Sequence, residues 1–208
     1  MPVFFVTGSD TGVGKTHVAG LLARRMARDG FTQVIKPVES GAAAGRPADA
    51  LKAAGKWAEA HTLLTLPAPI APLAAAKKAR KQLDLATLLK LYRAVPLAPC
   101  RVVESAGGVA VPIDPKGKDW SDFAAAIKPM AVIIVVEDRL GAINQARLAI
   151  AYLRRRYDGP MGVWLNAIKK PTPAVAAANR AGLADAWIPL YGESGPGKKP
   201  PRFHFLPR

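Results

Sequence analysis

The sequence contains very little cysteine and no long hydrophobic run. Its single cysteine, Cys100, excludes an internal disulfide and any zinc site built from several cysteines. The longest apolar run, residues 130–136, is far shorter than the roughly 20 residues that a membrane-spanning helix needs. The first residues also lack the basic segment and apolar stretch of a signal peptide. We therefore expect a cytoplasmic protein that does not enter a membrane.

Acidic residues are also scarce. The 208 residues include 15 aspartates and glutamates against 30 lysines and arginines, which gives a formal net charge of +15. Such an excess suits nucleic acid, an anionic membrane surface or an anionic substrate. The basic residues are spread along the chain, however, and no nucleic-acid motif interleaves them with aromatic residues. We therefore expect mostly solvated surface charges and no nucleic-acid partner.

Half of the residues are hydrophobic, and this length suits one α/β domain that spans residues 1–208. The first stretch with a clear chemical meaning is Gly-Ser-Asp-Thr-Gly-Val-Gly-Lys-Thr at residues 8–16. It follows an apolar run at 3–6, which predicts a buried strand, and leads into residues 16–29, whose apolar residues recur at helical spacing. A strand, a glycine-rich turn and a helix are the context of a phosphate-binding loop.

In such a loop the backbone N–H groups and the helix N-terminus bind phosphate. Lys15 would reach the terminal phosphates, and Thr16 would offer its hydroxyl to Mg²⁺. The spacing departs from the usual G-x-x-x-x-G-K-T, because one extra residue separates Gly8 from Gly14 and Ser9 replaces a glycine. The alternative is a glycine-rich turn with a chance lysine, but the flanking strand and helix favour a variant phosphate-binding loop.

Strand and helix patterns alternate along the rest of the chain. Strands are predicted at 32–35, 101–103, 131–136, 161–165 and 187–190, and helices at 49–57, 85–92, 119–128, 140–156 and 173–183. This alternation predicts a mostly parallel sheet with helices on both faces. Residues 63–76 contain three prolines and are expected to be extended or irregular, at the surface near the ligand, and the tail at 194–208 is expected to be irregular.

Polar residues recur where the predicted strands end. The glycine-rich loop follows the first strand, Lys36 and Ser40 follow the second, Glu104 follows the third, and Asn166 follows a later one. In parallel sheets ligands bind beyond the carboxyl ends of the strands. These residues therefore predict one ligand site at this edge of the sheet.

Four motifs together resemble dethiobiotin synthetase: residues 8–16, Lys-Pro-Val-Glu-Ser-Gly at 36–41, residues 103–108, and Leu-Gly-Ala-Ile-Asn at 140–144. Their order and spacing hold from about residue 3 to residue 193. The resemblance implies a P-loop NTPase-like fold and a homodimeric, ATP- and Mg²⁺-dependent ligase of biotin biosynthesis. Such an enzyme joins CO₂ to 7,8-diaminononanoate and closes a cyclic urea, through a carbamate and a carbamic-phosphoric anhydride, to give dethiobiotin.

The resemblance also implies roles for individual residues. It assigns catalysis to Lys15, Lys36, Thr11 and Ser40, and Mg²⁺ binding to Thr16, Asp49 and Glu104. It assigns nucleotide binding to Gly12, Val13, Gly14, Lys15 and Thr16, with Asn166 reading adenine and a loop at Gly192 and Glu193 closing over the nucleotide. It assigns substrate binding to Ser40, Gly107 and Gly108, and to Leu140, Gly141, Ala142, Ile143 and Asn144, which the family supplies from the other subunit at the interface.

Other functions remain open at this point. One is a degenerate paralogue that binds nucleotide without ligase turnover, and another is a related ligase for a different amine or acid. A third is a partitioning-type nucleotide-switch ATPase that binds nucleic acid. Partitioning ATPases carry a signature lysine near the start of the loop, where this chain has Asp10, which argues against that alternative.

Some residues suggest a weaker site or a simpler role. Ser105 stands where the family usually has glycine, and its side chain is expected to crowd the substrate or shift the backbone. Glu137 and Asp138 place two acids beside the proposed carboxylate site, where they would weaken binding. Simpler roles also exist, because Asp49 could cap a helix and Asn144 and Asn166 could be turn residues.

Overall fold

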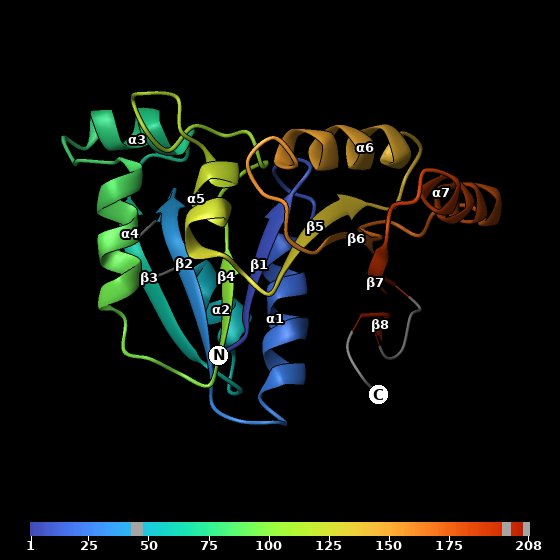
Figure 1. The fold of residues 1–208 in the computed structure, drawn as a ribbon, viewed down its shortest axis with the longest axis horizontal. Coiled ribbons are helices and arrows are strands. Elements are labelled where there is room, and N and C mark those ends of the chain that lie inside the picture. The colour runs from blue at the N-terminus through green and yellow to red at the C-terminus, as the bar shows by residue number, and fades with distance from the viewer. Residues whose placement is uncertain (43–47, 197–200, 206–208) are drawn as a thin grey trace.

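The computed structural model describes residues 1–42, 48–196 and 201–205. The strands are β1 Val3–Gly8, β2 Thr32–Ser40, β3 Glu59–Leu66, β4 Cys100–Glu104, β5 Ala131–Glu137, β6 Met161–Asn166, β7 Leu190–Ser194 and β8 Arg202–Phe203. The helices are α1 Lys15–Met26, α2 Asp49–Ala54, α3 Pro72–Lys78, α4 Leu85–Ala94, α5 Trp120–Ile127, α6 Ala142–Leu153 and α7 Pro173–Asp185. They enclose one sheet (Figure 1).

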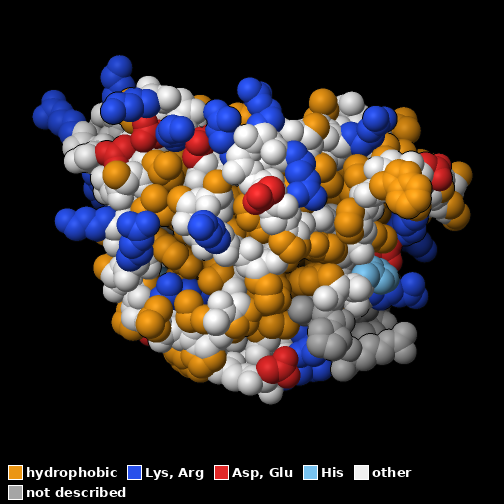
Figure 2. Space-filling view, viewed as in Figure 1, with side chains coloured by type: hydrophobic (Ala, Val, Ile, Leu, Met, Phe, Trp, Pro, Cys, Tyr) orange, Lys and Arg blue, Asp and Glu red, His pale blue; other side chains and the backbone are white. Residues whose placement is uncertain are grey.

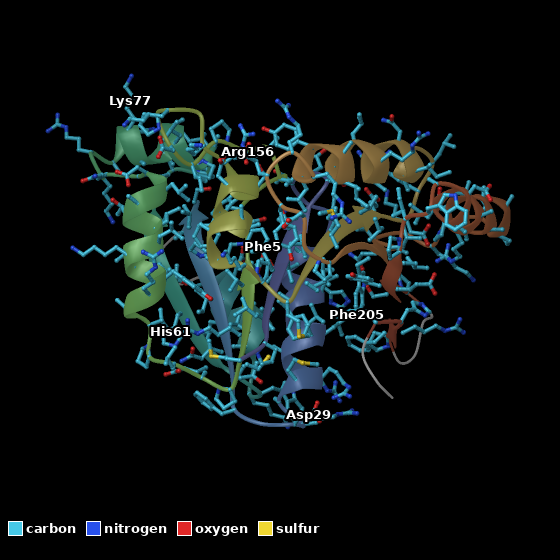
Figure 3. The ribbon with its side chains drawn as sticks, viewed as in Figure 1. Phe5, Asp29, His61, Lys77, Arg156 and Phe205 are labelled. Atoms are coloured by element: carbon cyan, nitrogen blue, oxygen red, sulfur yellow. The ribbon has the colours of Figure 1, made fainter. Side chains whose placement is uncertain are left out.

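The sheet has the strand order β3-β2-β4-β1-β5-β6-β7-β8. Neighbouring strands run parallel except for β7 and β8, which pair antiparallel. Helices α1 and α2 cover one face, where Phe4 and Val6 of β1 join the apolar side chains of α1. Helices α3 to α7 cover the other face, where Phe5 lies between the sheet and α5 (Figures 1 and 3). The predicted α/β fold with a mostly parallel sheet is confirmed.

Two segments differ from the predicted elements. Residues 63–66 are extended, as part of β3, and residues 67–71 lie outside any helix or strand, but residues 72–76 are helical, because α3 begins at Pro72. Proline is compatible with the first turn of a helix, where its missing N–H would have no intrahelical partner. The last predicted strand is also displaced: the backbone turns at Trp187, which has a φ of 54° and is 92% exposed, and β7 starts only at Leu190.

The tail is more ordered than predicted. Within residues 201–205, β8 pairs with β7, and the ring of Phe203 lies 5.2 Å from that of Trp164 between centroids. Phe205 stacks on Tyr191 at 4.6 Å. These aromatic contacts bury apolar surface that a proline- and lysine-rich composition does not reveal.

The carboxyl ends of the parallel strands lie along one edge of the sheet, and the polar residues of the predicted site are at this edge (Figure 1). His61 and Asp29 lie near the opposite edge (Figure 3). On the face shown in Figure 2, lysine and arginine side chains are scattered among apolar and uncharged ones. In the part of the chain that the structure describes, every helix is too short or too polar to cross a membrane.

Candidate active site

The glycine-rich loop connects β1 to α1 and turns through left-handed backbone conformations. Gly12 has a φ of 78° and Gly14, which precedes the first residue of α1, has a φ of 92°. Glycine adopts these angles without the strain that a Cβ atom would introduce. A Cβ atom on Gly14 would also lie 2.1 Å from Nδ2 of Asn166. Glycine at position 14 is therefore required both by its backbone conformation and by the close approach of Asn166, the last residue of β6.

The loop borders a cavity of about 310 Å³ at the carboxyl edge of the sheet. Most of the residues predicted to bind phosphate, metal or substrate line it: Thr11, Gly12, Gly14, Lys15, Thr16, Lys36, Ser40, Asp49, Glu104 and Gly107. Val13 is instead buried beneath the loop, 4% exposed. Segments far apart in the sequence thus meet in one small polar cavity.

Glu104 is the most deeply buried acid of this cavity, at 1% exposure. Its Oε1 accepts hydrogen bonds from Nζ of Lys36 at 2.6 Å and from the hydroxyl of Thr16 at 2.8 Å. Lys36 also donates to the carbonyl of Ser105 at 3.1 Å. The other carboxylate oxygen, Oε2, is buried with no hydrogen-bond partner among the described residues. A buried carboxylate oxygen favours a cation or a donor, so Glu104 fits a metal ligand.

Asp49 is the first residue of α2 and faces the same lysine. Its Oδ2 lies 3.6 Å from Nζ of Lys36, and Oδ1 accepts a hydrogen bond from Lys52 at 3.1 Å. Partial burial opposes ionisation, but Lys36 and Lys52 together hold the pKa of this carboxyl below its usual value. Its side chain does not cap α2, whose N-cap residue is Ala48. Asp49 is therefore an ionised carboxylate at the cavity wall.

Lys15 is buried at the other side of the cavity, and its Nζ donates to the carbonyl of Asp10 at 2.8 Å. Burial, with a contribution from the nearby positive charge of Lys36, lowers the pKa of Lys15 to about 8. An anion in the cavity would favour the protonated form. Lys15 and Lys36 thus bring two amino groups to the lining of one cavity.

Asn166 holds the loop from beneath. Its Nδ2 donates to the carbonyl of Val13 at 2.9 Å, and its Oδ1 accepts from the hydroxyl of Ser194 at 2.7 Å. Nε1 of Trp164 donates to the same hydroxyl at 2.8 Å. Asn166 also lines a second pocket of about 470 Å³, together with His17 and residues of the chain after β7. This pocket adjoins the loop at Gly12 and Gly14.

Ser194 is a residue that the sequence patterns did not single out. Its position was placed in an irregular tail, whereas it ends β7 and is 3% exposed. Gly192 and Glu193 also lie in β7 and not in a loop. Gly192 packs against the ring of Trp164, and the buried Glu193 forms an ion pair with Arg180 of α7. The predicted closing loop at these two residues is therefore wrong.

Ser105, Glu137 and Asp138 were each expected to weaken the site, and in the structure each side chain has a hydrogen-bond or ion-pair partner. Ser105 is fully buried, and its hydroxyl donates to Oγ1 of Thr7 at 3.0 Å, so the side chain does not line the cavity. Asp138 forms an ion pair with Arg180 at 2.9 Å, and Glu137 pairs with Arg139 at 3.1 Å. Each acid thus has a guanidinium partner, although Asp138 shares Arg180 with Glu193.

The segment 140–144 lies apart from the cavity beside the glycine-rich loop. It opens α6, and all its residues except the buried Ala142 line a groove of about 800 Å³ between α6 and α7. Gly108 lines a different groove of about 480 Å³, which connects Ser9 and Thr11 of the loop to Leu148 of α6. Within one chain the nucleotide and metal candidates converge, and residues 140–144 do not join them.

Comparison with known proteins gives a family for this arrangement. A family model described as an AAA domain matches residues 3–188. The ATP-dependent dethiobiotin synthetase of Anaeromyxobacter dehalogenans (strain 2CP-C) is 39% identical over 169 residues, which cover 78% of this chain and 75% of that protein. This chain belongs to the dethiobiotin synthetase family.

Two further proteins named ATP-dependent dethiobiotin synthetase match this chain over a larger share of their own length. That of Akkermansia muciniphila is 33% identical, with 91% of this chain and 90% of that protein covered. That of Paramagnetospirillum magneticum is 32% identical, with 86% and 93% covered. The predicted family, an ATP-dependent ligase family, is confirmed.

Solved structures place the fold among nucleotide-binding ATPases. A ParA family ATPase from Chlorobium tepidum superposes with a TM-score of 0.59 at 13% identity, covering 95% of this chain and 84% of that one. The MinC:MinD cell division complex of Aquifex aeolicus gives 0.52 at 16% identity, covering 93% and 80%. At such low identity the likeness concerns the fold, which agrees with the predicted P-loop NTPase-like architecture.

Proposed function

We propose that this protein is an ATP- and Mg²⁺-dependent ligase that converts 7,8-diaminononanoate and CO₂ to dethiobiotin in the cytoplasm. The observation that supports this most is the cavity beside the glycine-rich loop, where Lys15, Lys36, Asp49 and Glu104 face one another. Relatives named dethiobiotin synthetase cover most of this chain. The substrate and the reaction are proposed on that basis.

The cavity suits the two anions that the reaction brings together. A carbamate on one substrate amine attacks the γ-phosphorus of ATP, and the second amine then displaces phosphate from the mixed anhydride. Phosphoryl transfer depends mainly on positioning and on neutralising charge. We assign that neutralisation to Lys15 and Lys36, and hydrogen bonding near the transferring group and the diamine to Thr11 and Ser40.

The oxygen donors of the cavity fit Mg²⁺. Thr16, Asp49 and Glu104 offer one hydroxyl and two carboxylates, and Oε2 of Glu104 is buried without a partner among the described residues. Mg²⁺ prefers such hard oxygen ligands and keeps several waters. When bound, it would supply positive charge to the phosphate oxygens. In the adjoining pocket, we assign recognition of the base to Asn166.

A homodimer would complete the substrate site. Leu140, two residues before α6, and Leu148, in the middle of α6, are 81% and 63% exposed and border the groove between α6 and α7. Exposed leucines beside an apolar groove favour a protein interface. We propose that a second copy covers α6 and brings its residues 140–144 to the diamine, beside Gly107 and Gly108.

The decisive experiment measures ADP release by the purified protein with Mg²⁺-ATP and bicarbonate, with and without 7,8-diaminononanoate, and follows the product by mass. We expect ADP release that depends on the diamine, together with a product of the mass of dethiobiotin. Lys36→Ala should abolish it, because the carbamate and γ-phosphate lose a counter-charge. Lys52→Ala is the matched control, since Lys52 pairs with the same Asp49 from a half-exposed position.

Two results would refute the proposal. Nucleotide binding without diamine-dependent turnover would favour a non-ligase paralogue, or a nucleotide switch if nucleic acid were also bound at physiological salt. Turnover with another amine in place of the diamine would indicate a related ligase of different specificity.

A further inference from the structure

Glu39 is a buried acid for which the proposed reaction has no role. It lies one residue before the end of β2, inside the motif at 36–41, and is only 8% exposed. Glu39 nevertheless belongs to the lining of the cavity beside the glycine-rich loop. Oε1 accepts a hydrogen bond from the backbone N–H of Asp49 at 3.0 Å, which ties β2 to the first residue of α2. Oε2 is buried and has no hydrogen-bond partner among the described residues.

The lysines of the cavity are engaged elsewhere. Nζ of Lys36 donates to Glu104 and to the carbonyl of Ser105, and Nζ of Lys15 donates to the carbonyl of Asp10. Buried polar atoms in proteins are nearly always hydrogen-bonded, and a carboxylate oxygen can only accept. Oε2 of Glu39 therefore requires a donor that enters the cavity with a ligand.

The charge of the cavity favours a cation as the source of that donor. Three carboxylates, Glu39, Asp49 and Glu104, line it against two lysines, in a chain whose formal net charge is +15. Glu39 and Asp49 lie side by side in this set, because Oε1 of Glu39 accepts from the backbone N–H of Asp49. Mg²⁺ retains waters when protein carboxylates bind it, and these waters are strong hydrogen-bond donors.

We propose that Glu39 is an outer-sphere ligand of the metal site. Its Oε2 accepts a hydrogen bond from a metal-bound water, while its Oε1 holds Asp49 at the position from which the aspartate faces the cation. The inference rests on the proposed Mg²⁺ site. Partners of this kind orient the direct ligands of a metal, and their loss weakens metal binding by about 10- to 100-fold. Glu39 is thus a positioning residue for metal binding.

Glu39→Gln tests this role. Glutamine preserves the shape and an oxygen that can accept from Asp49, and removes the charge and the second acceptor. We would titrate Mn²⁺ into the full chain with ADP and follow the free ion by electron paramagnetic resonance. The Mn²⁺ dissociation constant should rise about 10-fold or more, with ADP affinity in the absence of metal unchanged. Glu59→Gln is the control, since that half-exposed carboxylate lies at the start of β3.

A second variant and three results decide the matter. Glu39→Asp keeps the charge on a shorter side chain and should bind Mn²⁺ more tightly than Glu39→Gln. Equal Mn²⁺ affinity in Glu39→Gln and the unmodified protein would overturn the inference, and so would weaker binding by Glu39→Asp than by Glu39→Gln. If Glu39→Gln instead raised the KM for the diamine and left the Mn²⁺ affinity unchanged, the inference would also be overturned. That result would indicate that Oε2 accepts from an ammonium group of the substrate. The Mn²⁺ titration requires no turnover, so its result can be distinguished from a failure of the proposed ligase function.

Discussion

The ion pair between Lys36 and Glu104 should carry a large part of the stability of the nucleotide site. Both side chains are almost fully buried, at 4% and 1% exposure, and their charged atoms lie 2.6 Å apart. Replacing Lys36 by methionine fills much of the same space but leaves the carboxylate in the protein interior. The hydroxyl of Thr16 would then be its remaining protein donor among those that the structure describes.

Removal of one partner from a buried pair lowers the free energy of unfolding by about 3–5 kcal/mol. For a chain of this length each kcal/mol lowers Tm by about 2–4 °C, so Lys36→Met should melt about 6–20 °C lower. Lys52→Met removes a partner of Asp49 from a half-exposed pair at 3.1 Å. Such surface pairs contribute about 0–1 kcal/mol, so this control should melt within a few degrees of the unmodified protein.

The assays are thermal melting and urea unfolding of the nucleotide-free protein, both followed by far-ultraviolet circular dichroism. The double variant Lys36→Met/Glu104→Gln should recover most of the loss, because it removes both buried charges together. Two outcomes would refute the reasoning: a Lys36→Met protein as stable as its parent, or a double variant that is less stable than Lys36→Met alone.

Three further predictions concern other parts of the site. Because the pKa of Lys15 is lowered to about 8, its charged form is lost as the pH rises through that value. Isothermal titration calorimetry should therefore show metal-free ATP binding weakening between pH 7.5 and 9.5. An affinity that does not change with pH would exclude a role for the charge of Lys15 in ATP binding. Ser194→Ala leaves Nε1 of Trp164 and Oδ1 of Asn166 without their shared hydroxyl; it should lower the free energy of unfolding by about 1–3 kcal/mol and weaken nucleotide binding, and unchanged urea unfolding would contradict this. Leu148→Asp should yield a monomer in sedimentation and abolish diamine-dependent turnover, and a dimeric variant would contradict the proposed interface at α6.

Most of the residues that line the cavity beside the glycine-rich loop could be predicted from the sequence. Parallel strands bring their carboxyl ends to one edge, which places the loop after β1 near Glu104, the last residue of β4. The prediction that Lys36 and Ser40 follow their strand is wrong, because β2 extends to Ser40 and contains both residues. Both nevertheless line the same cavity. Glycines at positive φ and a lysine at the start of α1 are local features with few alternatives. Family resemblance added Asp49, whose separation from β2 gives no sign of its contact with Lys36.

The rest could not be read from local patterns because it depends on tertiary contacts. Proline suggested irregular structure for 63–76, although Pro72 begins a helix. The bond between Ser194 and Asn166 joins neighbouring strands that are 28 residues apart in sequence. The pairing of Asp138 with Arg180 joins the residue after β5 to α7, and the sequence around Asp138 gives no sign of this partner. For Glu39, the sequence offers one sign of a role in the site: an acidic residue inside the motif at 36–41.

The position of β1 in the sheet gives the two halves of the nucleotide site different resistance to local opening. β1 is hydrogen-bonded to β4 and β5 and covered on both faces, whereas β8 pairs along two residues with β7 at the sheet edge. Amide hydrogen exchange should therefore be slowest in the strand that carries the phosphate loop and fast in the strands beside the base pocket. A bound nucleotide would then loosen first at its base while its phosphates stay held, and the two ends of the ligand would exchange with solvent on separate timescales.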